Sequence, residues 1–228
     1  MSDPNIIPVF PLIIVIAFLG GIILLAEVLN RMITSEAELT RKVVHIGAGN
    51  VIVLAWWFQI PAWIGISAAI VAATIALLSY FFPILPSINS VGRKSLGTFF
   101  YAVSMGVLIA WFFPQQPQYA TIGILTMAWG DGLAALIGQN FGRHPYQVFG
   151  NTKSWEGSLT MGVVTYGVSF LTLTVVEGNN WQIWSISLIV ATIATALEAV
   201  SKLGIDNLTV PIASGALSFF LIQTLLSS

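Results

Sequence analysis

Asp131 is the residue whose charge is hardest to reconcile with its sequence surroundings. It stands in Ala128-Trp-Gly-Asp-Gly-Leu-Ala134, inside an apolar run and seven residues before Gly138. On an α-helix this places it about 10 Å inside a membrane span, where a carboxylate is costly unless it is paired, hydrated or bound to a cation. Gly130 and Gly132 let another group approach closely. We predict that Asp131 binds a cation or acts in catalysis; the alternative is a structural bond to a neighbouring helix.

A second string, Lys153-Ser-Trp-Glu156-Gly157-Ser158, enters an apolar run and therefore marks the start of a helix. The free N–H groups of a first helical turn, together with Lys153 and Ser154, are suited to binding a phosphate. Glu156 can reach a metal ion or cap its own helix. Arg143 adds another cation in the same loop. The alternative is an ordinary N-cap beside a lysine that extends to the membrane surface.

Arg41-Lys42-Val-Val-His45 precedes another apolar run. Arg41 and His45 are four residues apart and share a helix face, and Lys42 lies beside that face. Such a cluster can bind a polyphosphate. It is equally what the cytoplasmic end of a membrane helix requires, and a lone histidine is more often a buried hydrogen-bonding residue than a base.

The last charged string runs from Glu198 to Pro211 and reads EAVSKLGIDNLTVP. Glu198 and Lys202 are four residues apart and can pair on a helix end. Asp206 and Asn207 then offer oxygens of the kind that Mg²⁺ binds. A capped turn between two helices is the alternative.

These strings combine phosphate-binding cations, metal-binding oxygens and a carboxylate, which is the combination that phosphoryl transfer needs. Two Lys-Ser sequences, in Gly92-Arg-Lys-Ser95 and Gly150-Asn-Thr-Lys-Ser154, do not complete the P-loop pattern. We therefore predict, without a P-loop, a highly charged soluble ligand bound with Mg²⁺ over a partner that arrives from the lipid.

The elements that position these residues are predicted to be membrane helices. The 228 residues are 57% apolar and 7% charged, with a mean hydropathy of +0.90, which excludes an ordinary soluble domain. We predict an all-α integral membrane protein, a single polytopic domain over residues 1–228, with about eight spans and seven as the alternative. The predicted spans cover residues 8–30, 43–59, 62–82, 96–113, 119–138, 158–176, 182–201 and 208–227.

The basic residues predict the orientation of these spans. All eight Lys and Arg residues fall in alternate connections, namely Arg31 to Lys42, Arg93 and Lys94, Arg143 to Lys153, and Lys202. The positive-inside rule places these connections in the cytoplasm and both termini outside it. Eight dispersed basic residues form no patch for nucleic acid, so no nucleic-acid partner is expected.

Four strings together resemble the polyprenol kinase family, which includes phytol, farnesol and dolichol kinases. They are RKVVHIGAG from Arg41, GDGLAALIGQNFGRH from Gly130, TKSWEGS from Thr152 and EAVSKLGIDNLTVP from Glu198. The resemblance spans about three quarters of the chain, and the short chain looks more like phytol kinase than dolichol kinase. It implies CTP as the donor, Mg²⁺, a membrane-embedded prenyl alcohol as the acceptor, and a bacterial inner, thylakoid or plastid membrane.

The strings and the resemblance together give the expected roles. The catalytic residues would be Asp131, Lys153 and Glu156, and the metal ligands Asp131, Glu198 and Asp206. The nucleotide would be bound by Arg41, Lys42, His45, Arg143, Lys153, Ser154 and Asn207. Two alternatives stay open: CDP-lipid synthesis like that of phosphatidate cytidylyltransferases, whose longer signature is absent here, and an ion-coupled transporter.

Overall fold

The computed structural model describes residues 8–32, 37–81 and 96–226. Within these ranges the chain forms eight continuous helical segments, and each overlaps one of the eight predicted spans. They are α1 (Val9–Met32), α2 (Ala37–Trp57), α3 (Ala62–Phe81), α5 (Gly97–Phe112), the composite α6 (Pro117–Leu125), η1 (Thr126–Asp131) and α7 (Gly132–Phe141), then α8 (Trp155–Glu177), α9 (Trp181–Val200) and α10 (Asp206–Leu225). The predicted all-α class is confirmed.

Six of these segments are long and apolar enough to cross a membrane, and the protein is a multi-pass membrane protein. The six are α1, α3, the composite helix, α8, α9 and α10. The 16-residue α5 is apolar but shorter, and the first turns of α2 carry Arg41 and Lys42. A count of eight crossings therefore stays a prediction.

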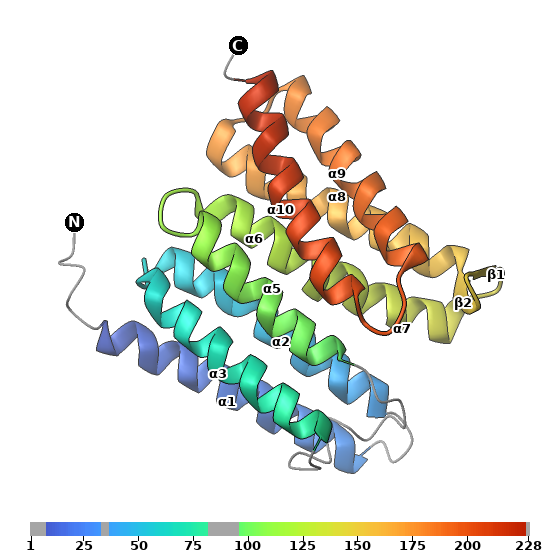
Figure 1. The fold of residues 1–228 in the computed structure, drawn as a ribbon, viewed down its shortest axis with the longest axis horizontal. Helices are drawn as coiled ribbons and strands as arrows, with labels where there is room; N and C mark the ends of the chain where they lie inside the picture. Colours follow the sequence, from blue (N-terminus) through green and yellow to red (C-terminus); the bar gives the residue numbers. More distant parts are fainter. Residues whose placement is uncertain (1–7, 33–36, 82–95, 227–228) are drawn as a thin grey trace.

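Successive helices run up and down, so their connections gather at two ends (Figure 1). Residues 58–61, 113–116 and 178–180 lie toward the left and the top of the view, with the start of α1 and the last turn of α10. Residues 142–154 and 201–205 lie toward the right. Every basic residue in the described ranges belongs to this second end or to the helix turns beside it; Arg93 and Lys94 lie outside those ranges.

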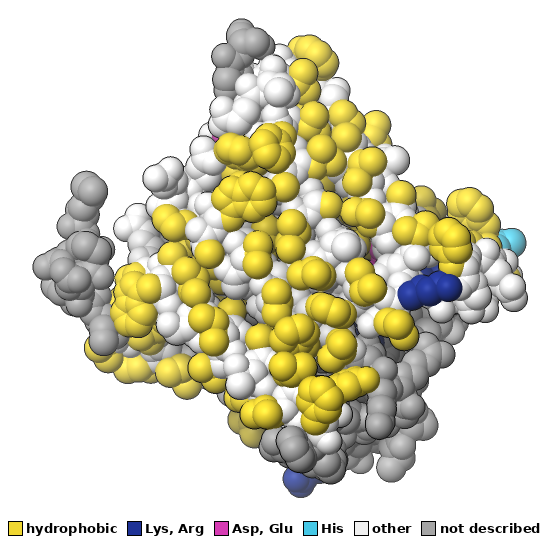
Figure 2. All heavy atoms as spheres, in the orientation of Figure 1, with side chains coloured by type: hydrophobic (Ala, Val, Ile, Leu, Met, Phe, Trp, Pro, Cys, Tyr) yellow, Lys and Arg dark blue, Asp and Glu magenta, His cyan; other side chains and the backbone are white. Residues whose placement is uncertain are grey.

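The composite helix is the centre of the bundle. Its η1 segment packs against α2, α8 and α10, and Tyr119, Ile122, Ile124 and Met127 are fully buried. In contrast, Figure 2 shows apolar side chains spread over the outer face, with Lys and Arg atoms near its margins only. Lipid accepts such a surface because the helical backbone satisfies its own hydrogen bonds.

A two-stranded hairpin joins the composite helix to α8, in a segment that was predicted only as a loop. β1 (Pro145–Val148) pairs antiparallel with β2 (Asn151–Ser154), so that Tyr146 faces Lys153 across the hairpin. The two loop residues, Phe149 and Gly150, both have positive φ (48° and 83°), as a type I′ turn requires. The hairpin therefore holds Lys153 at a fixed place at the end of the bundle.

Candidate functional site

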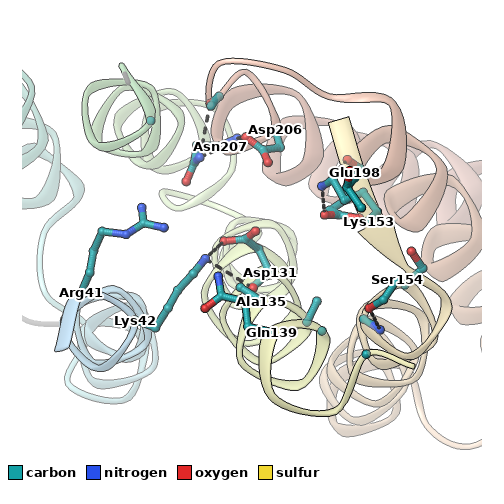
Figure 3. Close-up of a pocket in the computed structure, with 18 of the residues that line it drawn as sticks. Arg41, Lys42, Asp131, Ala135, Gln139, Lys153, Ser154, Glu198, Asp206 and Asn207 are labelled. Atoms are coloured by element: carbon teal, nitrogen blue, oxygen red, sulfur yellow. Dashed lines mark hydrogen bonds and ion pairs between the residues drawn. The ribbon is translucent and has the colours of Figure 1, made fainter. Parts of the chain in front are cut away.

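A cavity of about 750 Å³ opens at the end of the bundle that carries the basic residues. Its walls come from α2, the first turn of α5, the η1–α7 segment, the hairpin, and the turn between α9 and α10. Most of the predicted site residues line it, as Figure 3 shows: Arg41, Lys42, Asp131, Lys153, Ser154, Glu198, Asp206 and Asn207.

Asp131 lies in the cavity wall and pairs with Lys42 of α2. The Lys42 ammonium bonds to the Asp131 carboxylate and lies 3.4 Å from the Asp131 carbonyl oxygen. The two side chains are only 4% and 14% exposed, so each charge has its counter-charge where water is scarce. The structural bond to a neighbouring helix is thus present. The same carboxylate also borders the cavity, so the bond positions it there.

The π-helical turn of η1 explains how a charged residue is placed at this point. At Gly130 a Cβ would lie 2.7 Å from the Met161 sulfur, and at Gly132 a Cβ would lie 2.7 Å from Ile46. Both glycines therefore allow the close approach predicted from the sequence, with α8 on one side and α2 on the other. A π-bulge within an α-helix is a frequent feature of functional sites.

Lys153 and Glu198 form a second pair on the opposite side of the cavity. The Lys153 ammonium bonds to the Glu198 carboxylate and donates to the Glu198 carbonyl oxygen at 3.1 Å. Burial lowers the pKa of Lys153, but the charge and hydrogen bond of Glu198 and the charges of Asp206 and Asp131 together outweigh burial, so the pKa is raised above its usual value. Lys153 is therefore a permanent cation at the cavity wall.

The pairing of Glu198 with Lys202, expected from their spacing, is corrected by the structure. α9 ends at Val200, so Lys202 lies beyond the last helical turn and outside the i, i+4 geometry. Its ammonium instead lies 5.7 Å from the centre of the Phe149 ring in the hairpin loop.

Asp206 and Asn207 begin α10 and complete the cavity wall. The Asp206 Oδ1 atom accepts hydrogen bonds from the backbone and side-chain nitrogens of Asn207, both at 3.1 Å. Asn207 Nδ2 also donates to the Gly204 carbonyl oxygen at 3.2 Å. These bonds join the first turn of α10 to the preceding turn, and both side chains lie at the cavity (Figure 3).

Three residues with predicted roles do not line the cavity. His45 lies beneath it, with Nε2 3.2 Å from the Met127 carbonyl oxygen and 3.7 Å from the Asp131 carboxylate. Glu156 holds His144, a weak candidate from sequence, through a 2.6 Å contact to Nδ1 and a 3.3 Å bond from the backbone N–H. Arg143 belongs to the same loop. The structure thus places Glu156 and Arg143 beside the site and gives them no cavity contact.

Several cavity residues were not found by sequence reasoning. Gln139 and Ala135 follow Asp131 at intervals of four, so the composite helix presents one face to the cavity. That spacing could have predicted both residues from the sequence. Thr98 and Thr152 come from the start of α5 and from β2 and carried no such pattern.

Close glycine contacts fix the side of the cavity near α8. A Cβ at Gly142 would lie 2.9 Å from the Ser154 side chain, and one at Gly157 would lie 3.0 Å from the Ala134 carbonyl oxygen. The Ser154 hydroxyl accepts the Gly157 N–H at 3.1 Å and so caps α8. The backbone of α7 can therefore approach the start of α8, where a phosphate site was predicted.

The carboxylates of the cavity fit Mg²⁺ only as partial ligands. In the described ranges, no three His, Asp or Glu side chains come together closely enough to hold a metal by themselves. Asp131, Glu198 and Asp206 nevertheless border one cavity from three different elements. Mg²⁺ is commonly bound by one or two carboxylates plus substrate phosphates and water, and such a mode suits this wall.

Comparison with known proteins finds similar kinases. The chain is 53% identical over 203 residues to "Phytol kinase" of Synechocystis sp., which covers 89% of this chain and 87% of that protein. It is 28% identical to "Phytol kinase 1, chloroplastic" of Arabidopsis thaliana, over 87% of this chain and 72% of the relative. "Farnesol kinase, chloroplastic" of the same plant is 27% identical, over 82% and 66%. No protein-family model and no solved structure matches.

Proposed function

Because the chain belongs to the polyprenol kinase family, we propose that it phosphorylates a long-chain isoprenoid alcohol such as phytol. One structural observation supports the proposal independently of the names of the relatives. Two lysines and three carboxylates from distant parts of the chain border a single cavity at one end of an apolar helix bundle. A soluble phosphate donor and a lipid-soluble acceptor can meet only where such a cavity adjoins the membrane.

In the proposed reaction the oxygen of the alcohol attacks the terminal phosphorus of a nucleoside triphosphate. A new O–P bond forms, the bond to the leaving nucleoside diphosphate breaks, and the alcohol proton passes to a carboxylate. We assign the role of proton acceptor to Asp131, because its helix lies at the centre of the bundle. For this step the Lys42 ammonium turns from Asp131 to the phosphates.

Lys153 and the start of α8 would bind the phosphates from the other side of the cavity. Lys153 is cationic, and the partial positive charge at the N-terminus of α8, whose first turn is capped by Ser154, favours an anion. Asp131, Glu198 and Asp206 are the residues that would hold Mg²⁺. When bound, Mg²⁺ neutralises charge that develops on the phosphate oxygens during transfer.

We propose CTP as the donor and the cytoplasm as the compartment that the cavity faces. The family resemblance supports CTP, and the missing P-loop removes the usual reason to expect ATP. The basic residues around the cavity support the cytoplasmic orientation. The transporter alternative has little support, since such carriers place binding groups near the midplane, whereas the charged groups here gather at one end.

The test is a transfer assay with membranes that contain the protein, CTP labelled in its terminal phosphate, and Mg²⁺. We expect label on phytol, release of CDP, slower turnover with ATP, and no turnover after chelation of divalent ions. A lipid product that carries cytidine, with release of pyrophosphate, would show CDP-lipid synthesis instead. Full activity in the presence of chelator would overturn the role of Mg²⁺.

A further inference from the structure

One face of α2 holds the π-helical turn that carries Asp131. Besides the ion pair with Asp131 described above, His45 Nε2 lies 3.2 Å from the Met127 carbonyl oxygen. One turn farther along α2, a Cβ at Gly49 would lie 2.3 Å from the Cβ of Ala128, so the two helices pack closely there. His45 and Gly49 are four residues apart and therefore share this face. The position of the turn thus depends on α2.

His45 uses its ring N–H for the backbone of this turn. A carbonyl oxygen only accepts hydrogen bonds, so Nε2 is the donor and carries a proton. Met127 precedes Asp131 by four residues, about one helical turn, so the bonded carbonyl group and the carboxylate lie on the same side of η1. The same nitrogen is 3.7 Å from the Asp131 carboxylate, which is too long for a hydrogen bond. His45 is therefore tied to Asp131 through the backbone of η1.

Tyr101 of α5 supports the imidazole ring. The two ring centres are 4.1 Å apart, and the Tyr101 hydroxyl lies 3.4 Å from the His45 carbonyl oxygen. The side chain of His45 is only 11% exposed, and Tyr101 is buried. In contact with a buried aromatic ring and with the η1 backbone, the imidazole has little freedom to turn.

The proposed reaction makes such support necessary. In it the Lys42 ammonium turns from Asp131 to the phosphates, so the carboxylate loses its ion-pair partner when it must accept the proton. His45 does not line the cavity, so it can keep its bond to Met127 during this step. A misplacement of about 1 Å in a reacting group can cost about a hundredfold in rate. A second tie to the turn of Asp131 therefore has a direct effect on turnover.

We propose that His45 is a positioning residue that keeps the Asp131 carboxylate in place while Lys42 binds the phosphates; the inference rests on the function proposed above. The hydrogen bond from His45 to Met127 fixes the π-helical turn, and the turn fixes the carboxylate. His45 takes no proton from the alcohol, since Nε2 already carries one and donates it to a carbonyl oxygen. This role differs from the nucleotide contact that the sequence led us to expect.

Two substitutions at His45 separate the hydrogen bond from the imidazole ring. His45→Leu removes the donor, and we expect kcat to fall about tenfold or more while the KM for CTP stays within about twofold. In His45→Gln the side-chain amide can donate to the Met127 carbonyl oxygen, so kcat should stay within about threefold of the wild type. Equal losses in the two variants would overturn the proposal, because the N–H group would then not be what matters. A raised KM for CTP in His45→Leu would also overturn it and favour nucleotide contact.

His144→Leu is the matched control. His144 is the other histidine of the chain, lies at the cavity end of the bundle, is 75% exposed and does not line the cavity. Its substitution should leave kcat and the KM for CTP within about twofold of the wild type. Turnover in each variant is divided by the number of sites that bind CTP at equilibrium, so misfolded protein is not counted. A loss in His144→Leu as large as that in His45→Leu would refute a specific role of His45.

A double substitution shows whether His45 works through Asp131. Addition of His45→Leu to Asp131→Asn should lower the residual kcat by less than about twofold, because the carboxylate that His45 positions is already absent. A further loss as large as that in the wild-type background would mean that His45 acts independently, against the proposal. A wild type that phosphorylates no prenol would remove the proposed function and this inference with it. An active wild type with any of the contrary results above removes the inference alone.

Discussion

At the scale of single residues, the site is built from two lysine–carboxylate pairs. Lys42 and Asp131 are 89 positions apart, and Lys153 and Glu198 are 45 apart. Each pair brings a cation to the cavity wall without leaving a buried charge uncompensated. A phosphate that enters the cavity can pair with the two lysines in place of the carboxylates. The carboxylates can then bind a proton or a metal ion. The pairs thus keep the cavity stable while it is empty of substrate.

Asp131→Asn should abolish turnover while the protein remains folded in the membrane. The amide keeps the size of the side chain and can still accept a hydrogen bond from Lys42, but it neither takes the alcohol proton nor binds a metal ion well. We expect kcat to fall about a hundredfold or more. The measurement is the transfer assay, with thermal unfolding in detergent as the control for folding. Activity within a few fold of the wild type would leave Asp131 with a structural role only.

Lys153→Met should raise the KM for the nucleotide about tenfold, because one charged contact to the phosphates is lost. The KM for the prenol should not change. Lys202→Met is the matched control, since Lys202 lies at the same end of the bundle over Phe149 and does not line the cavity. An unchanged nucleotide KM in Lys153→Met, with the protein folded, would show that this side of the cavity does not bind phosphate.

At the scale of elements, the helices could be predicted and the pairing between them could not. Runs of apolar residues located each helical segment, because length and hydropathy are local properties. The glycines beside Asp131 also predicted a close approach, which the contacts of Gly130 with Met161 and of Gly132 with Ile46 confirm. The partner of each lysine depends on packing between distant helices. Glu198 was therefore matched with its near neighbour Lys202 in place of Lys153.

The hairpin was missed for a related reason. Its strands, PYQV and NTKS, are only four residues long and only partly covered. The alternation of Tyr146 and Val148 in the first strand is too short to predict a strand, and the second strand contains no apolar residue. Contacts with other elements stabilise the hairpin. The Tyr146 hydroxyl lies 2.5 Å from the Ser158 hydroxyl, and Asn151 donates to the Ser201 carbonyl oxygen at 3.0 Å. These contacts tie the hairpin to α8 and to the end of α9.

Gly123→Ala should destabilise the contact between α6 and α10. A Cβ at this position would lie 2.4 Å from the Pro211 carbonyl oxygen, so two helix backbones must separate. Overpacking of this kind costs about 1–3 kcal/mol, and we expect the midpoint of thermal unfolding in detergent to fall. Gly167→Ala in α8 is the matched control. A Cβ there meets no atom within 4 Å, and alanine favours a helix interior, so the midpoint should stay unchanged or rise. Equal midpoints for the two variants would contradict the close packing at Gly123.

At the scale of the whole molecule, charge and apolar surface are divided along one direction. The outer helices expose residues such as Ile23, Leu24 and Val175, and the charged cavity lies at one end of the bundle. This division suits an enzyme that joins a soluble donor to a lipid acceptor. It also means that the orientation in the membrane decides which pool of nucleotide the cavity can use.

Single cysteines can measure that orientation, because the chain contains no cysteine of its own. Gln115 and Gln147 are both exposed, but Gln115 lies in the connection between α5 and α6 and Gln147 lies in the hairpin at the other end. We expect an impermeant maleimide to label Gln115→Cys in intact cells and Gln147→Cys only after permeabilisation, because positively charged connections remain in the cytoplasm. Denatured samples, in which both thiols are accessible, control for expression. Labelling of both positions from the same side would contradict the up-and-down arrangement, and the reverse pattern would place the cavity outside the cytoplasm, away from its expected nucleotide.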